Sequence, residues 1–534
     1  MTAELVLHGG TIHTFTEGVV PAMLVRDGRV AAVGSADDCR RAAAGTPRSY
    51  DLAGRTVLPG FVDAHVHPLL LGDALGSVDL SPARSIAELV QLLRRHAATV
   101  PEPAAVTGYG YDQSKLAERR HPSRADLDAV STDRTVRVQH VSGHGYVVNS
   151  TALRESGITA DTVTPPGGRI DRDAAGEPTG VVFDAACDLL TGPSGVKIEG
   201  HGPNFHLPLD VPGRAATLAL GQRQLLSVGV TTVCDAQVTA RERLAYQEAE
   251  QDGSLRLRTH QLTLSSGLDE LEARVNPSPV PLGVKLYADG SVTARTAYLG
   301  QHCDGCARPD GYLYHEPDEL IALIGRAHRL GLPTATHAQG ELPIDIVLDA
   351  VERCRRADPR TDLVHRIEHC GFPTTAQIAR MAELRVVPVP QPMQVTLFAD
   401  SLIDEYGDYG GRFYPTGDFH RAGLPVVLSS DGPVTMPDPL RAVHSAVTRQ
   451  TVGDLVAGGT AGSVANQGVA TATAFAGVTT TAARLLGCHD VGALAPGSLA
   501  DFVVLDTDPT QAVERLRTAA VLETWIGGER VFAA

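Results

Sequence analysis

The chain has 534 residues, of which 43% are hydrophobic and 20% charged, a balance typical of soluble globular proteins. Its formal net charge of −16 excludes favourable binding to nucleic acid or to an anionic membrane surface, because both would repel it. The length is too great for one small domain and allows a barrel with a second unit.

The start of the chain, MTAELVLHGGTIHTF, lacks the basic and apolar segments of a secretory signal. The sequence contains no run of 18 apolar residues, so no membrane span is expected. The eight cysteines are scattered along the chain and predict free buried thiols instead of a disulfide framework. These features favour a cytoplasmic location.

Residues 1–56 predict short strands with tight turns, including a hairpin signal at Asp27-Gly28. Residues 489–534 have the same character, with apolar runs at 501–505 and 521–526 followed by Gly527-Gly528. We therefore expect both ends of the chain to build one small β-sandwich domain.

The segment 57–488 alternates short β-branched runs with helical patterns, which favours an α/β fold with parallel strands. Eight candidate strands predict a (β/α)8 TIM-type barrel. They lie near residues 61–65, 229–235, 257–263, 283–288, 332–336, 364–368, 385–390 and 425–430. The gap after the first strand requires an insertion at about 70–225, in which residues 164–180 predict a loop or hairpin over the barrel mouth.

The segment PGFVDAHVHP carries the sharpest chemical signal. His65 and His67 are two residues apart, so on a strand they project to the same side. Two imidazoles at one strand end provide half of a divalent metal site, although two histidines near a turn can also be purely structural.

Four further polar residues follow apolar runs and precede loops: Lys285, His337, His369 and Asp431. In a barrel, the carboxyl ends of the strands open into one shared mouth. Any one of these residues alone is explained by packing, but the whole set in this order indicates a site.

These motifs, together with VKLYADGS, THAQG, RIEHC and LSSDGPV, resemble the amidohydrolase superfamily over nearly the whole chain. The sequence is most similar to the amidohydrolase-3 branch, which includes N-substituted formamide deformylases. The resemblance implies a metal-dependent amidohydrolase acting on carbon–nitrogen bonds other than peptide bonds, with a small-molecule substrate and a homodimeric assembly.

The resemblance also implies a role for each matching residue. His65 and His67 would bind a first metal, and His337 and His369 a second. Lys285 matches a lysine that can be carboxylated to bridge two ions, and Asp431 would bind the first metal and shuttle a proton. The expected cofactor is zinc, as two ions if Lys285 is carboxylated and as one if it is not, although manganese and iron also suit these ligands.

Five residues are weaker candidates for contact with substrate. His144, in SGHGY, is expected to bind the substrate carbonyl or the developing oxyanion as a catalytic residue, with a loop-fixing histidine as the alternative. Asp289 and Arg295 follow the lysine strand, Gln391 ends the seventh strand, and Tyr111 lies in the insertion.

Three other sequence features do not predict a further functional site. Asp184 stands where relatives usually carry a glutamate, which puts an inherited role there in doubt. His302-Cys303-Asp304-Gly305-Cys306 lacks the second cysteine pair of a zinc knuckle, and Thr107–Gly110 lacks the helix opening of a phosphate loop.

The favoured function is hydrolysis of an amide or N-formyl group of a small organic substrate by a water made nucleophilic by the metal. A cyclic amide hydrolase or a deaminase of the same superfamily is the alternative, and ester hydrolysis stays open. A non-catalytic binding protein on a barrel scaffold is the remaining class, which the complete set of six ligand positions disfavours.

Overall fold

The structure is a computed structural model that describes residues 4–190, 210–273, 281–299, 311–359, 362–453 and 467–534. The predicted feature at 302–306 lies outside these residues. Within them, no helix combines the length and the apolar character that a membrane crossing requires.

Seven parallel strands form the central sheet, in the order β18-β17-β16-β15-β14-β13-β6. They are β6 (Phe61–Val66), β13 (Val230–Val238), β14 (Arg258–Leu264), β15 (Gly283–Tyr287), β16 (Thr334–Ala338), β17 (Arg366–His369) and β18 (Val387–Val389). Successive strands pair side by side, as in a (β/α)8 barrel, and most of them are buried along their whole length, as expected where helices cover the sheet. This confirms an α/β fold with a nearly closed parallel barrel.

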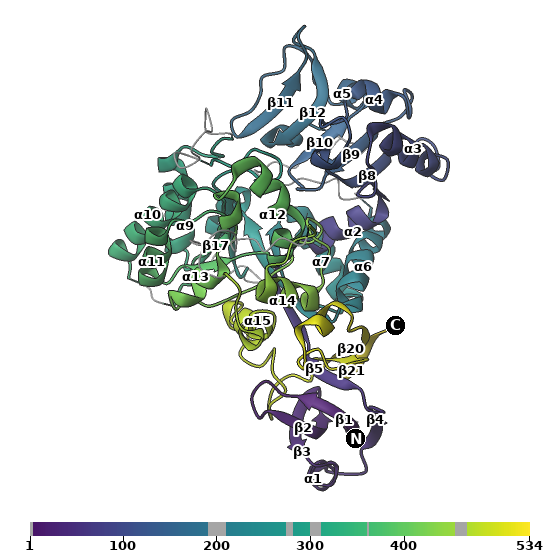
Figure 1. Ribbon diagram of the computed structural model, residues 1–534, viewed down its shortest axis with the longest axis vertical. Helices are drawn as coiled ribbons and strands as arrows, with labels where there is room; N and C mark the ends of the chain where they lie inside the picture. The colour runs from purple at the N-terminus through teal and green to yellow at the C-terminus, as the bar shows by residue number, and fades with distance from the viewer. Residues whose placement is uncertain (1–3, 191–209, 274–280, 300–310, 360–361, 454–466) are drawn as a thin grey trace.

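Helices alternate with these strands and pack around them. Figure 1 shows α9, α10 and α11 along one flank of the barrel and α2 and α6 along another. The helices of this layer are α2 (Pro68–Gly76), α6 (Val211–Ser227), α7 (Ala240–Gln251), α8 (Leu268–Ala273), α9 (Pro317–Arg329), α10 (Glu341–Ala357), α11 (Thr375–Leu384), α12 (Pro392–Tyr406), α13 (Thr416–Arg421), α14 (Pro439–Thr448), α15 (Thr471–Gly477) and α16 (Thr480–Leu485). Side-chain caps define several starts, such as Thr374, which forms a capping box with Gln377 at α11.

The eighth barrel strand, expected at 425–430, is not formed. The segment still lies between β18 and β6, because the Ser429 Oγ contacts the Pro390 carbonyl at 3.3 Å and the Asp431 amide donates to the His65 carbonyl at 2.8 Å. The amide of Ser430, however, donates to the side chain of Asp63 at 3.1 Å. The amides of Leu428 and Asp431 bond to the carbonyls of Gly477 and His65, so the apolar run forms irregular backbone and no regular ladder with β18 or β6.

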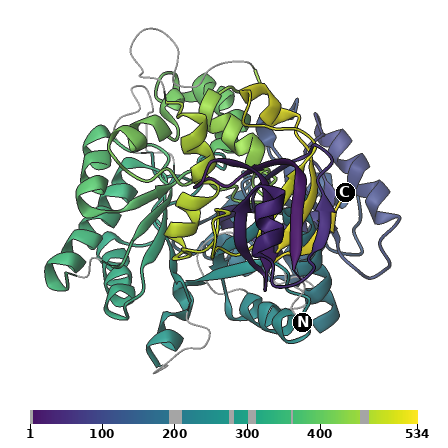
Figure 2. The same ribbon diagram turned by 90° about the horizontal axis from the view of Figure 1, so that it is seen from below.

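Strands from the two ends of the chain share one eight-stranded sheet, ordered β21-β20-β19-β5-β1-β2-β3 with β4 beside β1. These strands are β1 (Leu5–His13), β2 (Val19–Arg26), β3 (Arg29–Gly34), β4 (Arg48–Asp51), β5 (Thr56–Pro59), β19 (Phe502–Leu505), β20 (Val521–Ile526) and β21 (Glu529–Ala533). The helix α1 (Ala36–Ala42) follows β3. In Figure 2 the purple N-terminal strands lie beside the yellow C-terminal ones. Strands from both ends of the chain thus share this sheet, whereas the expected β-sandwich domain is not confirmed.

A separate six-stranded sheet, called here the insertion sheet, lies in the chain between β6 and β13, in the order β11-β12-β10-β9-β8-β7. Its strands are β7 (Val78–Asp79), β8 (Val106–Tyr111), β9 (Val136–His140), β10 (Gly145–Val148), β11 (Gly168–Arg172) and β12 (Pro178–Asp184), with helices α3 (Ile86–Ala97), α4 (Arg124–Asp128) and α5 (Ser150–Glu155). Strands β11 and β12 form the hairpin expected near 164–180. Figure 1 places this sheet at the end of the barrel opposite to the terminal sheet.

Candidate metal centre

The first three predicted ligands meet at the end of β6. One side-chain ligand atom from each of His65, His67 and Asp431 lies within 4.8 Å of the others, and all three residues are buried. The Oδ1 atom of Asp431 is 3.3 Å from Nε2 of His65 and 3.4 Å from Nε2 of His67. The fold therefore brings Asp431 to two histidines that precede it by more than 360 residues in the chain, at the mouth that the barrel strands share.

The remaining predicted ligands adjoin this cluster. The ring of His369 is centred 5.0 Å from that of His65 and 4.5 Å from that of His337. Lys285, on β15, is fully buried, and its Nζ lies 4.7 Å from the centre of the Tyr287 ring. The amine of Lys285 interacts electrostatically with Asp431, His337 and His369, so all six positions lie in one region of the barrel.

Each of three histidines has one ring nitrogen held by a partner. Nδ1 of His65 forms a hydrogen bond with Glu368, and Nδ1 of His369 forms one with Oε1 of Gln391 at 2.7 Å. His337 uses Nε2 for the carbonyl of Gly290 at 2.9 Å. The second nitrogen of His65, Nε2, and that of His337, Nδ1, are buried and have no hydrogen-bond partner among the described residues. Such orphaned nitrogens are costly unless a ligand such as a metal ion binds them.

Charge in the cluster also suits a cation. Burial lowers the pKa of His369 to about 3 and that of His337 well below its ordinary value, which keeps both imidazoles neutral as a metal requires. Burial alone would raise the pKa of Asp431, but the imidazoles of His65 and His67 hold it well below its ordinary value. His337 and His369 therefore offer neutral imidazoles near the ionised carboxylate of Asp431.

His67 lies between two carboxylates. Its Nδ1 is 3.6 Å from Oδ1 of Asp235, and its Nε2 faces Asp431. Burial alone would lower the pKa of His67, but these carboxylates raise it to about 9. The position consequently favours a positive charge, which a proton supplies in the absence of a metal ion.

Lys285 has the properties that a reactive amine requires. Its Nζ is buried and without a hydrogen-bond partner among the described residues. Burial lowers the pKa of this amine to about 8, so a neutral, nucleophilic fraction is present near neutral pH. Among the described residues Lys285 forms no ion pair, and the nearby Asp289 accepts hydrogen bonds from the backbone amides of Tyr298, Gln339 and Gly340 instead.

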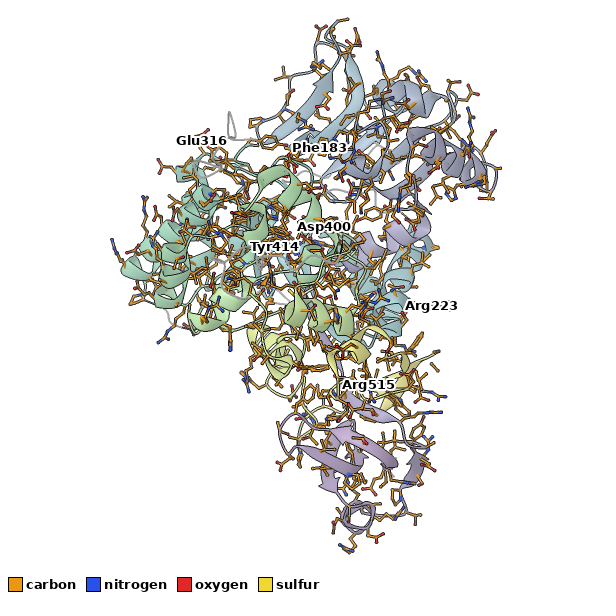
Figure 3. All side chains as sticks on the ribbon, in the orientation of Figure 1. Phe183, Arg223, Glu316, Asp400, Tyr414 and Arg515 are labelled. Carbon is orange, nitrogen blue, oxygen red and sulfur yellow. The ribbon has the colours of Figure 1, made fainter. Side chains whose placement is uncertain are left out.

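Several residues at the site hold others in place. Glu368 accepts from Arg366 as well as from His65, and both of its side-chain partners are buried. Gln394 donates its Nε2 to Oδ2 of Asp431 at 3.0 Å and accepts from the hydroxyl of Tyr414 at 2.9 Å. Tyr414, labelled in Figure 3, is fully buried. Sequence reasoning missed these supports, although Arg366 and Glu368 two apart on a strand carry the same signal as His65 and His67.

The predicted substrate contacts have different outcomes. Gln391 supports His369 and also donates to the Ser429 hydroxyl, so its amide is engaged. The Arg295 side chain is 56% exposed and pairs with Glu405 at 3.1 Å, away from the cluster. The hydroxyl of Tyr111 bonds to Nδ1 of His121 at 3.0 Å within the insertion sheet. Asp289 is buried and organises backbone, although its Oδ1 approaches Nε2 of His337 at 3.7 Å. The structure therefore does not bring Arg295 or Tyr111 to the metal cluster.

His144 does reach the cluster. It lies just before β10, and its ring is centred 5.3 Å from that of His337. Its Nδ1 is 2.6 Å from Oδ1 of Asp184. The insertion sheet thus contributes a histidine to the barrel mouth.

Unusual backbone conformations mark the same region. His369 and Asp431 have φ angles of 67° and 57°, in the left-handed region that side-chain-bearing residues rarely adopt. Such strained positions often occur where a site fixes the direction of a side chain. The two ligand candidates are therefore set by backbone geometry as well as by their hydrogen bonds.

Comparison with known proteins gives consistent relatives. The Amidohydrolase family profile matches residues 48–532. An N-substituted formamide deformylase of Arthrobacter pascens is 31% identical over 95% of this chain and 94% of its own length. The solved structure of an uncharacterised metal-dependent hydrolase from Pyrococcus horikoshii OT3 has a TM-score of 0.75 at 28% identity and covers 96% of this chain and 99% of its own. A corresponding hydrolase from Pyrococcus furiosus has a TM-score of 0.72 at 28% identity, with coverages of 95% and 100%. The chain belongs to the amidohydrolase family.

Proposed function

We propose that this protein is a metal-dependent hydrolase that cleaves the C–N bond of an amide or N-formyl group on a small organic amine. The observation that carries the proposal is the pattern of ring nitrogens in three neighbouring histidines. Partners hold one nitrogen each of His65, His337 and His369, and the second nitrogen of His65 and of His337 is buried without a hydrogen-bond partner among the described residues. The similarity to an N-substituted formamide deformylase supports the N-formyl group as the first substrate class to test.

The proposed ligands are His65, His67, Lys285, His337, His369 and Asp431. Zinc suits imidazole and carboxylate donors, and carboxylation of Lys285 would turn its buried amine into a carboxylate-like donor that two ions can share. When bound in such a set, a divalent cation supplies a Lewis acid for the carbonyl and favours ionisation of a water molecule. Two ions are therefore proposed with a carboxylated Lys285, and one with an unmodified lysine.

The residues of the chain complete the reaction. Asp431 takes up a proton from the attacking water and returns it to the leaving nitrogen, so that the C–N bond breaks to give a carboxylic acid and an amine. Gln394 fixes the orientation of this carboxylate through Oδ2, while Oδ1 stays with His65 and His67. His144 contacts the substrate from the insertion sheet.

The test begins with metal content. Protein purified without chelators or added metal is analysed by elemental mass spectrometry, and N-formyl and N-acetyl derivatives of simple amines are then assayed for release of the free amine. We expect close to two metal equivalents per chain and hydrolysis of at least one formamide. One equivalent would favour an unmodified Lys285 and extend the assay to deamination. Near-zero metal, with no turnover after addition of zinc or manganese, would contradict the proposal.

A further inference from the structure

A buried hydrogen-bonded group joins the insertion sheet to the barrel beside the metal centre. Its members are His144 before β10, Asp184 at the end of β12, and the hydroxyls of Tyr312 and Tyr314 from the segment after β15. Phe183, next to Asp184 in the chain, lies where the insertion sheet faces the barrel in Figure 3. The group therefore links the insertion sheet to the segment between β15 and α9 of the barrel.

Asp184 is the centre of this group. Its carboxylate is fully buried, and it accepts from both tyrosine hydroxyls as well as facing Nδ1 of His144 at 2.6 Å. Its φ angle of 53° lies in the left-handed region, which indicates that the surrounding contacts hold it there. Burial opposes ionisation of Asp184, but the hydrogen bonds from His144, Tyr312 and Tyr314 lower its pKa. The Asp184 side chain is therefore an ionised carboxylate.

The hydrogen positions follow from this arrangement. An ionised carboxylate accepts hydrogen bonds and donates none, so Nδ1 of His144 carries the hydrogen. In the neutral imidazole, Nε2 then presents a lone pair. Nδ1 makes the hydrogen bond found for this ring among the described residues, and the ring packs against His337 and Tyr287 at centroid distances of 5.3 and 6.3 Å. Nε2 is therefore left as an acceptor on a ring that packs against the proposed ligand His337.

We propose that Nε2 of His144 accepts the N–H of the substrate amide, so that the site selects secondary amides, with Asp184 as the residue that positions His144. The inference rests on the proposed function and narrows its substrate class. A secondary amide offers one N–H, whereas a tertiary amide offers none and would leave Nε2 facing an alkyl group. It assigns to His144 the amide nitrogen side of the substrate instead of the carbonyl oxygen expected from the sequence.

The test compares matched substrates. N-butylformamide and N-phenylformamide are assayed with zinc-loaded enzyme against their N-methyl counterparts, and the ratio of kcat/KM within each pair is measured. We expect the wild type to prefer the N–H member by about 10- to 100-fold, the cost of losing one hydrogen bond and leaving its acceptor unpaired. His144→Ala should reduce this ratio to below about threefold, mainly by slowing the N–H member.

Two further variants examine the positioning role. Asp184→Asn removes the negative charge that holds the hydrogen of His144 on Nδ1, which should lower the ratio of kcat/KM between the N–H and the N-methyl substrates. Tyr314→Phe should lower the ratio less. Tyr50→Phe is the matched control, because it removes a tyrosine hydroxyl bonded at 2.7 Å to the carboxylate of Glu523 in the terminal sheet.

Metal content and thermal unfolding are recorded for every variant, so that loss of fold or metal is distinguished from loss of selectivity. If His144→Ala does not fold, the ratios of Asp184→Asn and Tyr314→Phe decide the question. The inference about His144 would be overturned, with the proposed function unaffected, by either of two results. One is the same ratio of kcat/KM in the wild type and the variants, and the other is an equal loss of kcat/KM on both substrates of a pair. Absence of hydrolysis of all four formamides by zinc- or manganese-loaded wild type would overturn both the proposed N-formyl activity and this inference.

Discussion

Replacing Glu368 by glutamine tests whether the partner of His65 decides which ring nitrogen faces the metal centre. Glu368 and Arg366 have side chains that are 0% and 4% exposed, and Glu368 also accepts from Nδ1 of His65. Glutamine has one acceptor oxygen for these two groups, and its amide nitrogen must face a donor. Either Arg366 or His65 then loses its partner inside the barrel.

Two magnitudes follow from this geometry. Breaking a buried charge pair on one side costs about 3–5 kcal/mol, because the remaining guanidinium is left uncompensated. Loss of the partner that orients a metal-binding histidine typically weakens metal affinity about 10- to 100-fold. We therefore expect Glu368→Gln to lose both stability and zinc affinity.

Denaturant unfolding of the metal-free protein measures the first effect, and competition with a chromophoric zinc chelator measures the second. Asp37→Asn is the matched control, since it makes the same carboxylate-to-amide change in a pair with Arg40 whose side chains are 79% and 48% exposed. The control should leave the unfolding midpoint and zinc affinity unchanged, because exposed pairs contribute little. If Glu368→Gln also leaves both unchanged, partner-controlled orientation of His65 is refuted.

Two other variants address the proposed metal chemistry. Asp431→Asn should retain much of the metal, as elemental analysis would show, but lose at least about 100-fold in turnover, because an amide cannot take up the proton. Activity within about tenfold of the wild type would contradict the proposed role of Asp431. Lys285→Ala should lower the metal content and recover part of it, together with activity, when formate or propionate is added, whereas Lys285→Arg should not respond; two bound ions in the untreated Lys285→Ala protein would exclude a bridging carbamate.

The positions of the proposed ligands could be predicted because they depend on a simple feature of parallel barrels. A polar residue that ends a buried strand faces the mouth, and His65 and His67 lie on the same side of β6 by the two-residue repeat of a strand. Asp431 reaches them from the end of the irregular segment that takes the place of the eighth strand. These inferences need only the order of the strands and not the details of packing.

Predictions failed where a residue close in sequence to the site was assumed to point toward it, or where an apolar run was assumed to form a strand. Arg295 follows the lysine strand closely, but a φ angle of 56° turns the chain there and its guanidinium pairs with Glu405 at the surface. Residues 425–430 have the apolar character of a buried strand, but the Ser430 amide bonds to a side chain. Neither outcome can be read from residue type, because each depends on which backbone group finds a partner across the fold.

The supporting partners were the hardest part to predict, and they specify the chemistry. An imidazole can offer either nitrogen, and the partner that binds one determines which nitrogen is left for a metal or a substrate. Glu368 is 303 residues from His65, and Tyr312 is 128 residues from Asp184. The motif that contains a histidine therefore shows that a site exists, whereas residues far along the chain decide what that histidine can bind. By the same principle, Glu368 leaves Nε2 of His65 for the proposed metal ion, and Asp184 leaves Nε2 of His144 for the proposed contact with an amide N–H.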